Sequence, residues 1–247
     1  PLIFMKKKDY VIIIPARLGS TRLPEKPLIS LKGIPIIKRT YQRCIKALPK
    51  NDVYVATDSK KIQNFCLKNF MNCIMTSKKC LTGTDRVAEA AKKINSKFYI
   101  NIQGDEPFFS SKDIKRLIKF SKKYPKFVLN GFTSIKNKRQ YFSSHVPKVV
   151  FNKKNELLYM SRSPIPGNKT KNFIKAWRQV CAYIFPKKML IKFYNSNKKG
   201  TFEAIEDIEI LRFTEMGQKV KMVKLSSSSM AIDTHQDLSL ARKRLSK

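Results

Sequence analysis

Residues 10–28 read YVIIIPARLGSTRLPEKPL, a short apolar run followed at once by a loop rich in glycine, proline and cations. The run over residues 10–14 is β-branched and does not alternate with polar residues. Such a run favours a strand that is buried on both faces, as in a parallel sheet. The loop that follows carries three cations and two small residues: Arg17, Gly19, Ser20, Arg22 and Lys26.

This loop is a candidate anion-binding site. Glycine allows backbone amides to approach an anion, and nearby guanidinium and ammonium groups neutralise phosphate charge. The alternative interpretation is a solvated loop in a basic protein. The loop belongs to neither of two common phosphate-binding classes, because the sequence lacks both the Walker A pattern and the GxGxxG dinucleotide fingerprint.

Strand and helix patterns alternate through the rest of the first half. Apolar strand patterns cover residues 52–58 and 98–102, and helical patterns cover residues 35–47, 60–69, 84–94 and 112–122. This alternation predicts an α/β fold with a doubly wound, mostly parallel sheet. Ligands of such sheets bind outside the carboxyl ends of the strands, where the loop after residue 14 and the loop over residues 103–107 would lie.

The middle of the chain has a different character. Residues 128–193 contain short apolar segments separated by turns, which predicts antiparallel strands in an insert. A single amphipathic helix is expected over residues 203–216, then a strand over 220–223 and a closing helix over 237–244. We expect one domain over residues 1–247, with an insert at about 130–200 for substrate binding or dimerisation.

The composition is strongly basic. The 247 residues include 52 Lys+Arg against 17 Asp+Glu, a formal net charge of +35. This balance favours anionic partners. A basic nucleic-acid-binding protein is the rival interpretation, and it predicts an affinity that falls steeply with salt. The excess lysine is scattered along the chain, as a lysine-rich genome would also produce, so nucleic acid is not the expected partner.

Cysteine usage and hydropathy narrow the class of protein. The five cysteines include no CxxC pair, which argues against a disulfide framework or a zinc finger and fits a reducing, cytoplasmic environment. No apolar run approaches the ~20 residues that a membrane span needs.

Acidic side chains are scarce, and several follow strands. Asp105 and Glu106 end the strand at 98–102, and Asp233 follows a short apolar segment. Carboxylates in this position are placed to hold a hard cation such as Mg²⁺, and two aspartates from distant strands could share one. The alternatives are a turn acid for the first pair and a cap of the last helix for Asp233.

Two other segments carry arginines with possible ligand roles. Residues 82–86 (TGTDR) open a helix with a Thr cap, and Arg86 could also face a ligand. Arg162 ends an extended segment and could bind a carboxylate in bidentate fashion. No Ser/His/Asp or Cys/His arrangement can be argued from the spacing.

The ordered set of motifs is more specific than its parts. Residues 14–28 (IPARLGSTRLPEKPL) resemble the N-terminal signature of the CMP-Kdo synthetases, the 3-deoxy-manno-octulosonate cytidylyltransferases. The resemblance continues through motifs in the family's order: VATD at 55–58, TGTDR at 82–86, NIQGDEP at 101–107, KVV at 148–150, YMSR at 159–162, the helix at 203–212 and IDT at 232–234.

This resemblance implies a fold of the nucleotide-diphospho-sugar transferase type, usually in a homodimer, and a place in lipopolysaccharide or capsule biosynthesis. The implied reaction joins CTP to a 2-keto-3-deoxy sugar acid with Mg²⁺ and releases pyrophosphate. The catalytic residues implied by motif match are Arg17, Lys26, Asp105 and Asp233. The nucleotide site would comprise Pro15, Ala16, Arg17, Gly19, Ser20, Lys26, Thr84, Arg86, Gln103 and Asp105.

The same match implies the remaining site residues. Asp105 and Asp233 would be the magnesium ligands. The sugar acid would meet Arg162, at its carboxylate, and further residues of the second half: Gln179, Tyr183, Glu209 and Asp233.

The chain departs from the family pattern at positions that contact the sugar acid in family members. Gln179 stands where family members carry a His that contacts Kdo, and Ile210 replaces the Gln of a Glu-Gln-Leu-Arg motif. The family's Pro-Gly-Thr-Gly run is replaced by residues 228–231 (SSMA). Because such swaps can move substrate choice, the acceptor is either Kdo or a related acid, such as a nonulosonic, amino-octulosonic or phosphonate acceptor. A degenerate, non-catalytic homologue is disfavoured because the four catalytic positions are intact.

Overall fold

The computed structural model describes residues 8–19 and 22–246, and the chain divides into two compact units. The first unit contains the chain up to Lys115 together with the C-terminal segment from Ser228, and the second runs from Arg116 to Ser227. The insert expected at about 130–200 falls within the second unit. The expectation of a single domain stays a prediction.

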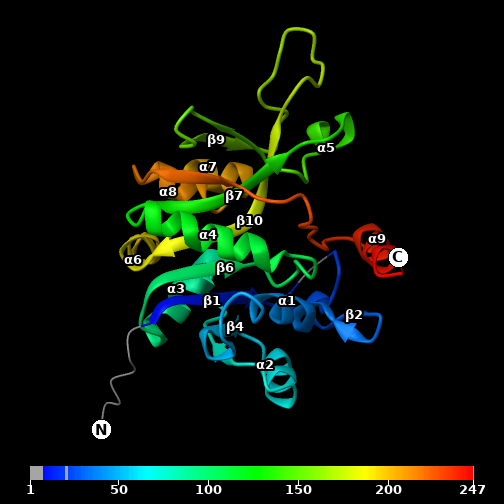
Figure 1. Ribbon diagram of the computed structural model, residues 1–247, viewed down its shortest axis with the longest axis vertical. Helices are drawn as coiled ribbons and strands as arrows, with labels where there is room; N and C mark the ends of the chain where they lie inside the picture. The colour runs from blue at the N-terminus through cyan, green and yellow to red at the C-terminus, as the bar shows by residue number, and fades with distance from the viewer. Residues whose placement is uncertain (1–7, 20–21, 247) are drawn as a thin grey trace. The chain divides into compact units, whose positions relative to one another are not determined.

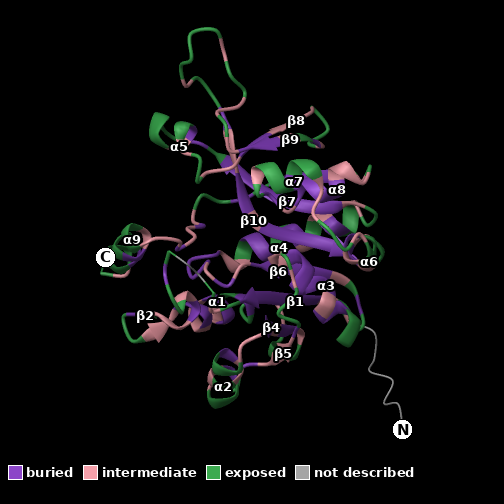
Figure 2. Cartoon of the chain, turned by 180° about the vertical axis from the view of Figure 1, so that it is seen from behind, coloured by how far each residue is buried: buried purple, intermediate pink, exposed green. Residues whose placement is uncertain are grey.

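The first unit is built on parallel strands. Their order in space is β6 (Ser96–Ile102), β1 (Lys8–Ala16), β4 (Val53–Thr57) and β5 (Cys73–Met75). Ile12 pairs with Ile100 of β6 on one side and with Val53 of β4 on the other. Residues 11–14 have no exposed surface, and β1 is purple in Figure 2. The central position of β1 confirms the strand predicted from its unbroken apolar run.

The four helices of this unit are α1 (Ile36–Cys44), α2 (Lys60–Lys68), α3 (Gly83–Lys93) and α9 (His235–Arg244), shown in Figure 1. Three of them, α2, α3 and α9, begin at a side-chain cap. The hydroxyls of Ser59 and Thr82 accept the backbone N–H of Ile62 and of Asp85, the usual N-cap bond. Short elements complete the unit: η1 (Lys26–Leu28), β2 (Ser30–Leu31), β3 (Ile34–Pro35) and η2 (Lys50–Asp52).

The second unit has mixed pairing. Its strands lie in the order β11 (Val220–Lys224), β7 (Val128–Ser134) and β10 (Trp177–Pro186), with β8 (Lys148–Phe151) beside β10 and β9 (Leu157–Ser161) beside β8. Only β11 and β7 are parallel to each other; the other pairs are antiparallel. These pairs confirm the antiparallel strands predicted for the middle of the chain.

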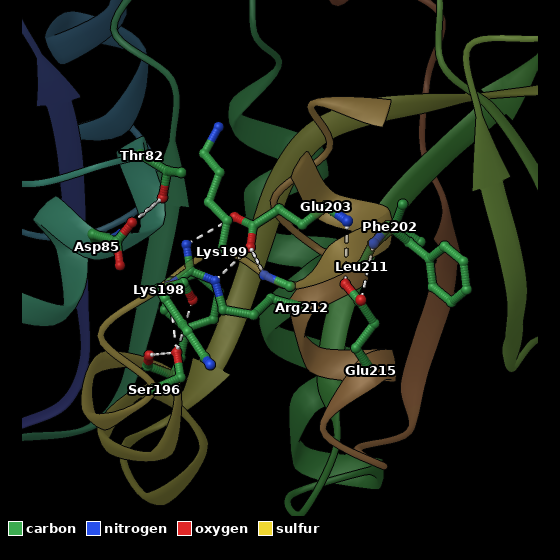
Figure 3. A network of polar contacts seen from close by, with 12 residues as sticks. Thr82, Asp85, Ser196, Lys198, Lys199, Phe202, Glu203, Leu211, Arg212 and Glu215 are labelled. Carbon is green, nitrogen blue, oxygen red and sulfur yellow. Dashed lines mark hydrogen bonds and ion pairs between the residues drawn. The ribbon is translucent and has the colours of Figure 1, made fainter. Parts of the chain in front are cut away.

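The helix predicted over residues 203–216 is wrong as a single element. The chain forms α7 (Thr201–Glu206) and α8 (Leu211–Glu215), separated by Asp207 in the left-handed conformation with φ of 49°. Asp tolerates this conformation better than most residues, and a helix cannot continue through it. Ile205, an apolar residue within the predicted amphipathic helix, is 74% exposed. Figure 3 shows the polar contacts that join these two short helices.

Three further helices lie in or at the edge of this unit: α4 (Ser111–Lys123), α5 (Lys138–Phe142) and α6 (Lys187–Asn195). Only α4 was expected from the sequence. Across the part of the chain that the structure describes, no helix has the length and apolar character needed to cross a membrane.

Candidate active site

The loop after β1 carries the first group of predicted site residues. Pro15 and Ala16 end β1 and are buried, whereas Arg17 and Gly19 are exposed. Within residues 8–19 and 22–246, no carboxylate pairs with Arg17. Its guanidinium is therefore available to an anion from solution. Ser20, predicted to line the nucleotide site, lies outside the described residues.

The loop after β6 approaches the loop after β1 at Gly104. A Cβ at Gly104 would lie 2.9 Å from the Pro15 carbonyl oxygen and 3.1 Å from the Ile37 side chain. Only glycine allows two backbones to approach so closely. The contact places the next residue, Asp105, beside the segment that contains Lys26.

Lys26 lies between two aspartates. Its ammonium is 2.5 Å from Asp105 Oδ2 and 2.9 Å from Asp233 Oδ1. Burial of the ammonium lowers the pKa of Lys26, but the two carboxylates outweigh this effect and leave the pKa above its usual value. Arg22 adds a longer contact of 3.8 Å to Asp233. The structure thus brings Lys26, Asp105 and Asp233 together.

Asp233 is not the cap of the last helix. Thr234 caps α9, and the Asp237 carboxylate accepts the backbone N–H groups of Thr234 and Asp233 at 2.9 and 3.1 Å. The Ile232 N–H donates to the Asp105 carbonyl at 3.1 Å, which fixes the two segments side by side. Because Thr234 is the N-cap and Asp237 completes the capping box, the Asp233 carboxylate can face Lys26.

Glu106, the neighbour of Asp105, is held by a different partner. Its side chain is 3% exposed and accepts the Ser229 hydroxyl at 2.9 Å on both oxygens. Ser229 belongs to the segment over residues 228–231 (SSMA). Asp105 contacts Lys26, whereas the Glu106 carboxylate accepts the Ser229 hydroxyl, so the two neighbouring carboxylates contact different partners.

Asp105 and Asp233 fit a magnesium ion. Both carboxylates already contact one cation, the Lys26 ammonium, so they converge within the reach of a single charge. Oxygen ligands from one or two carboxylates, completed by water and substrate phosphates, are the usual protein contribution to Mg²⁺ binding. Among the residues that the structure describes, no group of three or more His, Cys, Asp or Glu side chains could hold a metal.

The other predicted nucleotide residues lie in α3 and after β6. Thr84 is buried in the first turn of α3, and Gln103, which follows β6, is partly exposed. Arg86 is 3% exposed; its guanidinium donates to the Thr76 hydroxyl at 2.5 Å and pairs with Asp58 at 3.0 Å. Arg86 is thus held rigidly by two neighbours that the spacing of the motifs did not indicate.

In the second unit, hydrogen bonds to Glu206 and nearby residues hold Arg162 in place. The Arg162 guanidinium donates to the carbonyl oxygens of Glu206, Ser144 and Asp207 at 2.5, 2.9 and 3.0 Å. The Glu206 carboxylate accepts the Arg162 N–H at 2.7 Å and the Ser161 hydroxyl at 2.6 Å. These bonds hold the guanidinium in one orientation and leave some of its five donors for another ligand.

A fully buried lysine supports the same segment. Lys148 in β8 has no exposed surface, and its ammonium donates to the carbonyl oxygens of Ser143, at 2.9 Å, and Arg162. Burial lowers the pKa of Lys148 to about 8, and the Arg162 charge adds to this effect against the opposing influence of Glu206.

This lysine predicts a rise of stability with pH. Because the pKa of Lys148 is about 8 in the folded chain and has the ordinary lysine value of 10.5 in the unfolded chain, the unfolded chain binds more protons between these limits. The free energy of unfolding should therefore rise across this window, by at most about 1.4 kcal/mol per pH unit from this group. Lys148→Met should lack the rise.

Urea unfolding of the wild type and of Lys148→Met at pH 7.5, 8.5 and 9.5 measures the difference, since both proteins share all other titrations. Lys153→Met, at an exposed position in the turn after β8, is the control and should follow the wild type. If the free energy of unfolding changes with pH to the same extent in the wild type and in Lys148→Met, the lowered pKa of Lys148 is contradicted.

The residues predicted to read the sugar lie in β10 and between α7 and α8. Gln179 and Tyr183 are 5% and 3% exposed, and Glu209 is partly exposed in the turn before α8. Ile210 is 1% exposed and packs in the core.

Comparison with known proteins places the chain in a family. A family model described as cytidylyltransferase matches residues 11–222. The 3-deoxy-manno-octulosonate cytidylyltransferase of Thermodesulfovibrio yellowstonii is 36% identical, with 94% of this chain and 96% of that protein covered. That of Christiangramia forsetii is 35% identical, with coverages of 97% and 98%.

A solved structure agrees with these sequence matches. The structure of CMP:2-keto-3-deoxy-manno-octonic acid synthetase complexed with CTP gives a TM-score of 0.88 at 29% identity, covering 97% of this chain and 99% of the other. The match confirms the predicted α/β fold, with a mixed, mostly parallel sheet, of the nucleotide-diphospho-sugar transferases. The chain therefore belongs to the 3-deoxy-manno-octulosonate cytidylyltransferases, the CMP-Kdo synthetase family, and is a nucleotidyltransferase of that type.

Proposed function

We propose that this cytidylyltransferase joins CTP to a 2-keto-3-deoxy sugar acid, Kdo or a close relative, and releases pyrophosphate in a magnesium-dependent reaction. The convergence of Asp105 and Asp233 on Lys26, beside the loop that carries Arg17, is the observation that carries the proposal. The relative solved with CTP supports the choice of nucleotide.

The proposed reaction must bring together two anions, CTP and the sugar acid. The anomeric hydroxyl of the sugar acid attacks the α-phosphorus of CTP, and the P–O bond to pyrophosphate breaks. Arg17 and Lys26 offset the phosphate charge that accumulates at the reacting centre and on the leaving group. The close approach of Gly104 to Pro15 fixes the backbone next to Arg17 and Asp105.

Mg²⁺ held by Asp105 and Asp233 would add charge stabilisation and would lower the pKa of the attacking hydroxyl. We assign no separate protein base. Ala16, Gly19, Ser20, Thr84, Arg86 and Gln103 are proposed to surround the cytidine, with Arg86 held in place by Asp58 and Thr76. Arg162 is proposed to meet the sugar carboxylate, beside Gln179, Tyr183 and Glu209.

We also propose that the chain forms a cytoplasmic homodimer. Residues at about 130–200 would contribute to dimerisation and to sugar binding. This part of the proposal rests on the family resemblance, and sedimentation of the purified chain would test the oligomeric state.

Pyrophosphate release tests the reaction. The wild type should release pyrophosphate from CTP with Mg²⁺ and at least one acid of a panel that includes Kdo and nonulosonic acids. The methyl ketoside of each acid is the matched control, because its blocked anomeric hydroxyl cannot attack. EDTA should stop the release. Release that is equally fast with the methyl ketosides, or no release with any acid although CTP binds, would contradict the proposed acceptor chemistry.

A further inference from the structure

A cavity in the first unit is lined by cations that the proposed reaction does not use. Its volume is about 500 Å³, which is within the range of small-molecule sites. The lining comes from α1 and the residues just after it, from the loop after β6 and from the residue after α9, and it includes Arg39, Arg43, Lys46, Pro107, Phe108 and Leu245. None of the residues predicted to bind the nucleotide, the metal or the sugar acid lines this cavity.

Three of these lining residues form a row of like charges. Arg39 and Arg43 on α1 are four residues apart, so their side chains are neighbours on the helix surface, and Lys46 follows three residues later. Burial, together with the charge of Arg43, lowers the pKa of Arg39. No acidic residue lines the cavity, and no carboxylate of the described residues pairs with any of the three cations. An anion bound in the cavity would offset this repulsion.

The Arg39 guanidinium is already held in one orientation. Its Nε and Nη2 donate to the Leu31 carbonyl oxygen at 3.1 and 2.5 Å, and Nη2 also reaches the Lys32 carbonyl oxygen at 3.5 Å. Among the described residues Arg39 makes no other hydrogen bond, so both N–H groups of its Nη1 are available to a ligand. A guanidinium fixed in this way loses little freedom when it binds a phosphate.

Apolar side chains form another part of the lining. Phe108 is 6% exposed and packs in the same core cluster as Leu245, which is partly buried. The Arg244 guanidinium lies 4.4 Å from the centre of the Phe108 ring and donates to the Ser228 carbonyl oxygen at 2.9 Å, so a fourth cation stands beside this wall. Cations next to an apolar wall suit a ligand with an anionic group on an apolar body, whereas an inorganic ion would leave the apolar wall uncovered.

We propose that this cavity is a second ligand site, separate from the cluster around Lys26, and that it binds a small organic phosphate whose body is an apolar ring. A phosphate monoester carries close to two negative charges at neutral pH, so it matches three cations without an acid better than a single carboxylate does. Its ring would pack against Phe108 and Leu245. This inference does not rest on the proposed function, because the two sites share no residue.

Isothermal titration calorimetry of the full chain with 1-naphthyl phosphate tests the site. The probe should bind one to one with a Kd of about 1 mM or lower, both without CTP and with saturating CTP. Inorganic phosphate, which lacks the ring, and 1-naphthol, which lacks the charge, should each bind at least about tenfold more weakly. Arg43→Met/Lys46→Met removes two of the cations and should raise the Kd of the probe about tenfold.

The matched control is Lys60→Met/Lys68→Met, which removes the same charge from exposed positions on α2 and should keep the wild-type Kd within about twofold. Arg43 and Lys46 are exposed as well, so both double variants should keep the fold. If the control weakens binding as much as the cavity variant does, the net charge attracts the probe and the inference is overturned. Binding that saturating CTP abolishes would place the probe in the nucleotide site, and that result or no binding of 1-naphthyl phosphate would also overturn it.

Discussion

Asp105→Asn is expected to lower kcat for pyrophosphate release by roughly 10²–10³-fold, the usual cost of removing one preorganised charge contact from a reacting centre. The substitution is isosteric and removes the charge of one of the two carboxylates that converge on Lys26. The proposed Mg²⁺ site would keep only Asp233. The apparent magnesium affinity should therefore fall as well.

The fold should survive this substitution. Lys26 keeps its 2.9 Å contact with Asp233, and the Asp105 carbonyl keeps its bond from the Ile232 N–H. Asp9→Asn is the matched control, because Asp9 pairs with Lys97 on the surface, where both side chains are more than half exposed. Steady-state kinetics over a magnesium titration measures the effect. An Asp105→Asn enzyme with wild-type kcat and unchanged magnesium dependence would remove Asp105 from the metal site.

The parts of this molecule that follow from local patterns could be predicted from the sequence. The apolar run at residues 10–14 gave a central strand, and Thr82 caps α3 as its position indicated. The cluster of Lys26, Asp105 and Asp233 is different, because its members are 79 and 207 positions apart. The positions of Asp105 and Asp233 after predicted strands suggested that the two could share a cation, but only the family motifs added Lys26 to them.

The features that sequence reasoning missed are tertiary. The hydrophobic period continues through residues 203–216, and nothing in it marks the left-handed Asp207 that separates α7 from α8. No sequence pattern indicated the role of Glu206 either, because that role depends on the Arg162 segment folding against it. Asn130 is an isolated polar residue within a strand pattern, and only its hydrogen bonds to the Val180 and Ala182 carbonyls, at a bulge in β10, explain why it is buried.

The contact that joins α7 to α8 should have the largest effect on stability. Arg212 and Glu203 are 2% and 1% exposed, and the guanidinium donates to the carboxylate in bidentate fashion at 2.6 and 2.8 Å, as Figure 3 shows. The guanidinium also lies 3.7 Å from the centre of the Phe193 ring. Removing one partner of such a pair leaves an uncompensated charge in the interior, which costs about 3–5 kcal/mol.

Arg212→Met should therefore lower the free energy of unfolding by about 3–5 kcal/mol, which corresponds to a fall in Tm on the order of 10 °C for a chain of this size. If the loss comes from the orphaned carboxylate, adding Glu203→Gln should restore part of it, since a neutral amide is cheaper to bury and can still accept the Gly200 N–H. Lys199→Met removes the exposed pair with Asp207 nearby and should change stability by less than about 1 kcal/mol. Chemical denaturation of Arg212→Met, Glu203→Gln, the double variant and Lys199→Met measures these differences. A double variant that is as unstable as the sum of its two single substitutions would show that packing around Phe193, rather than the buried charge, holds the two helices together.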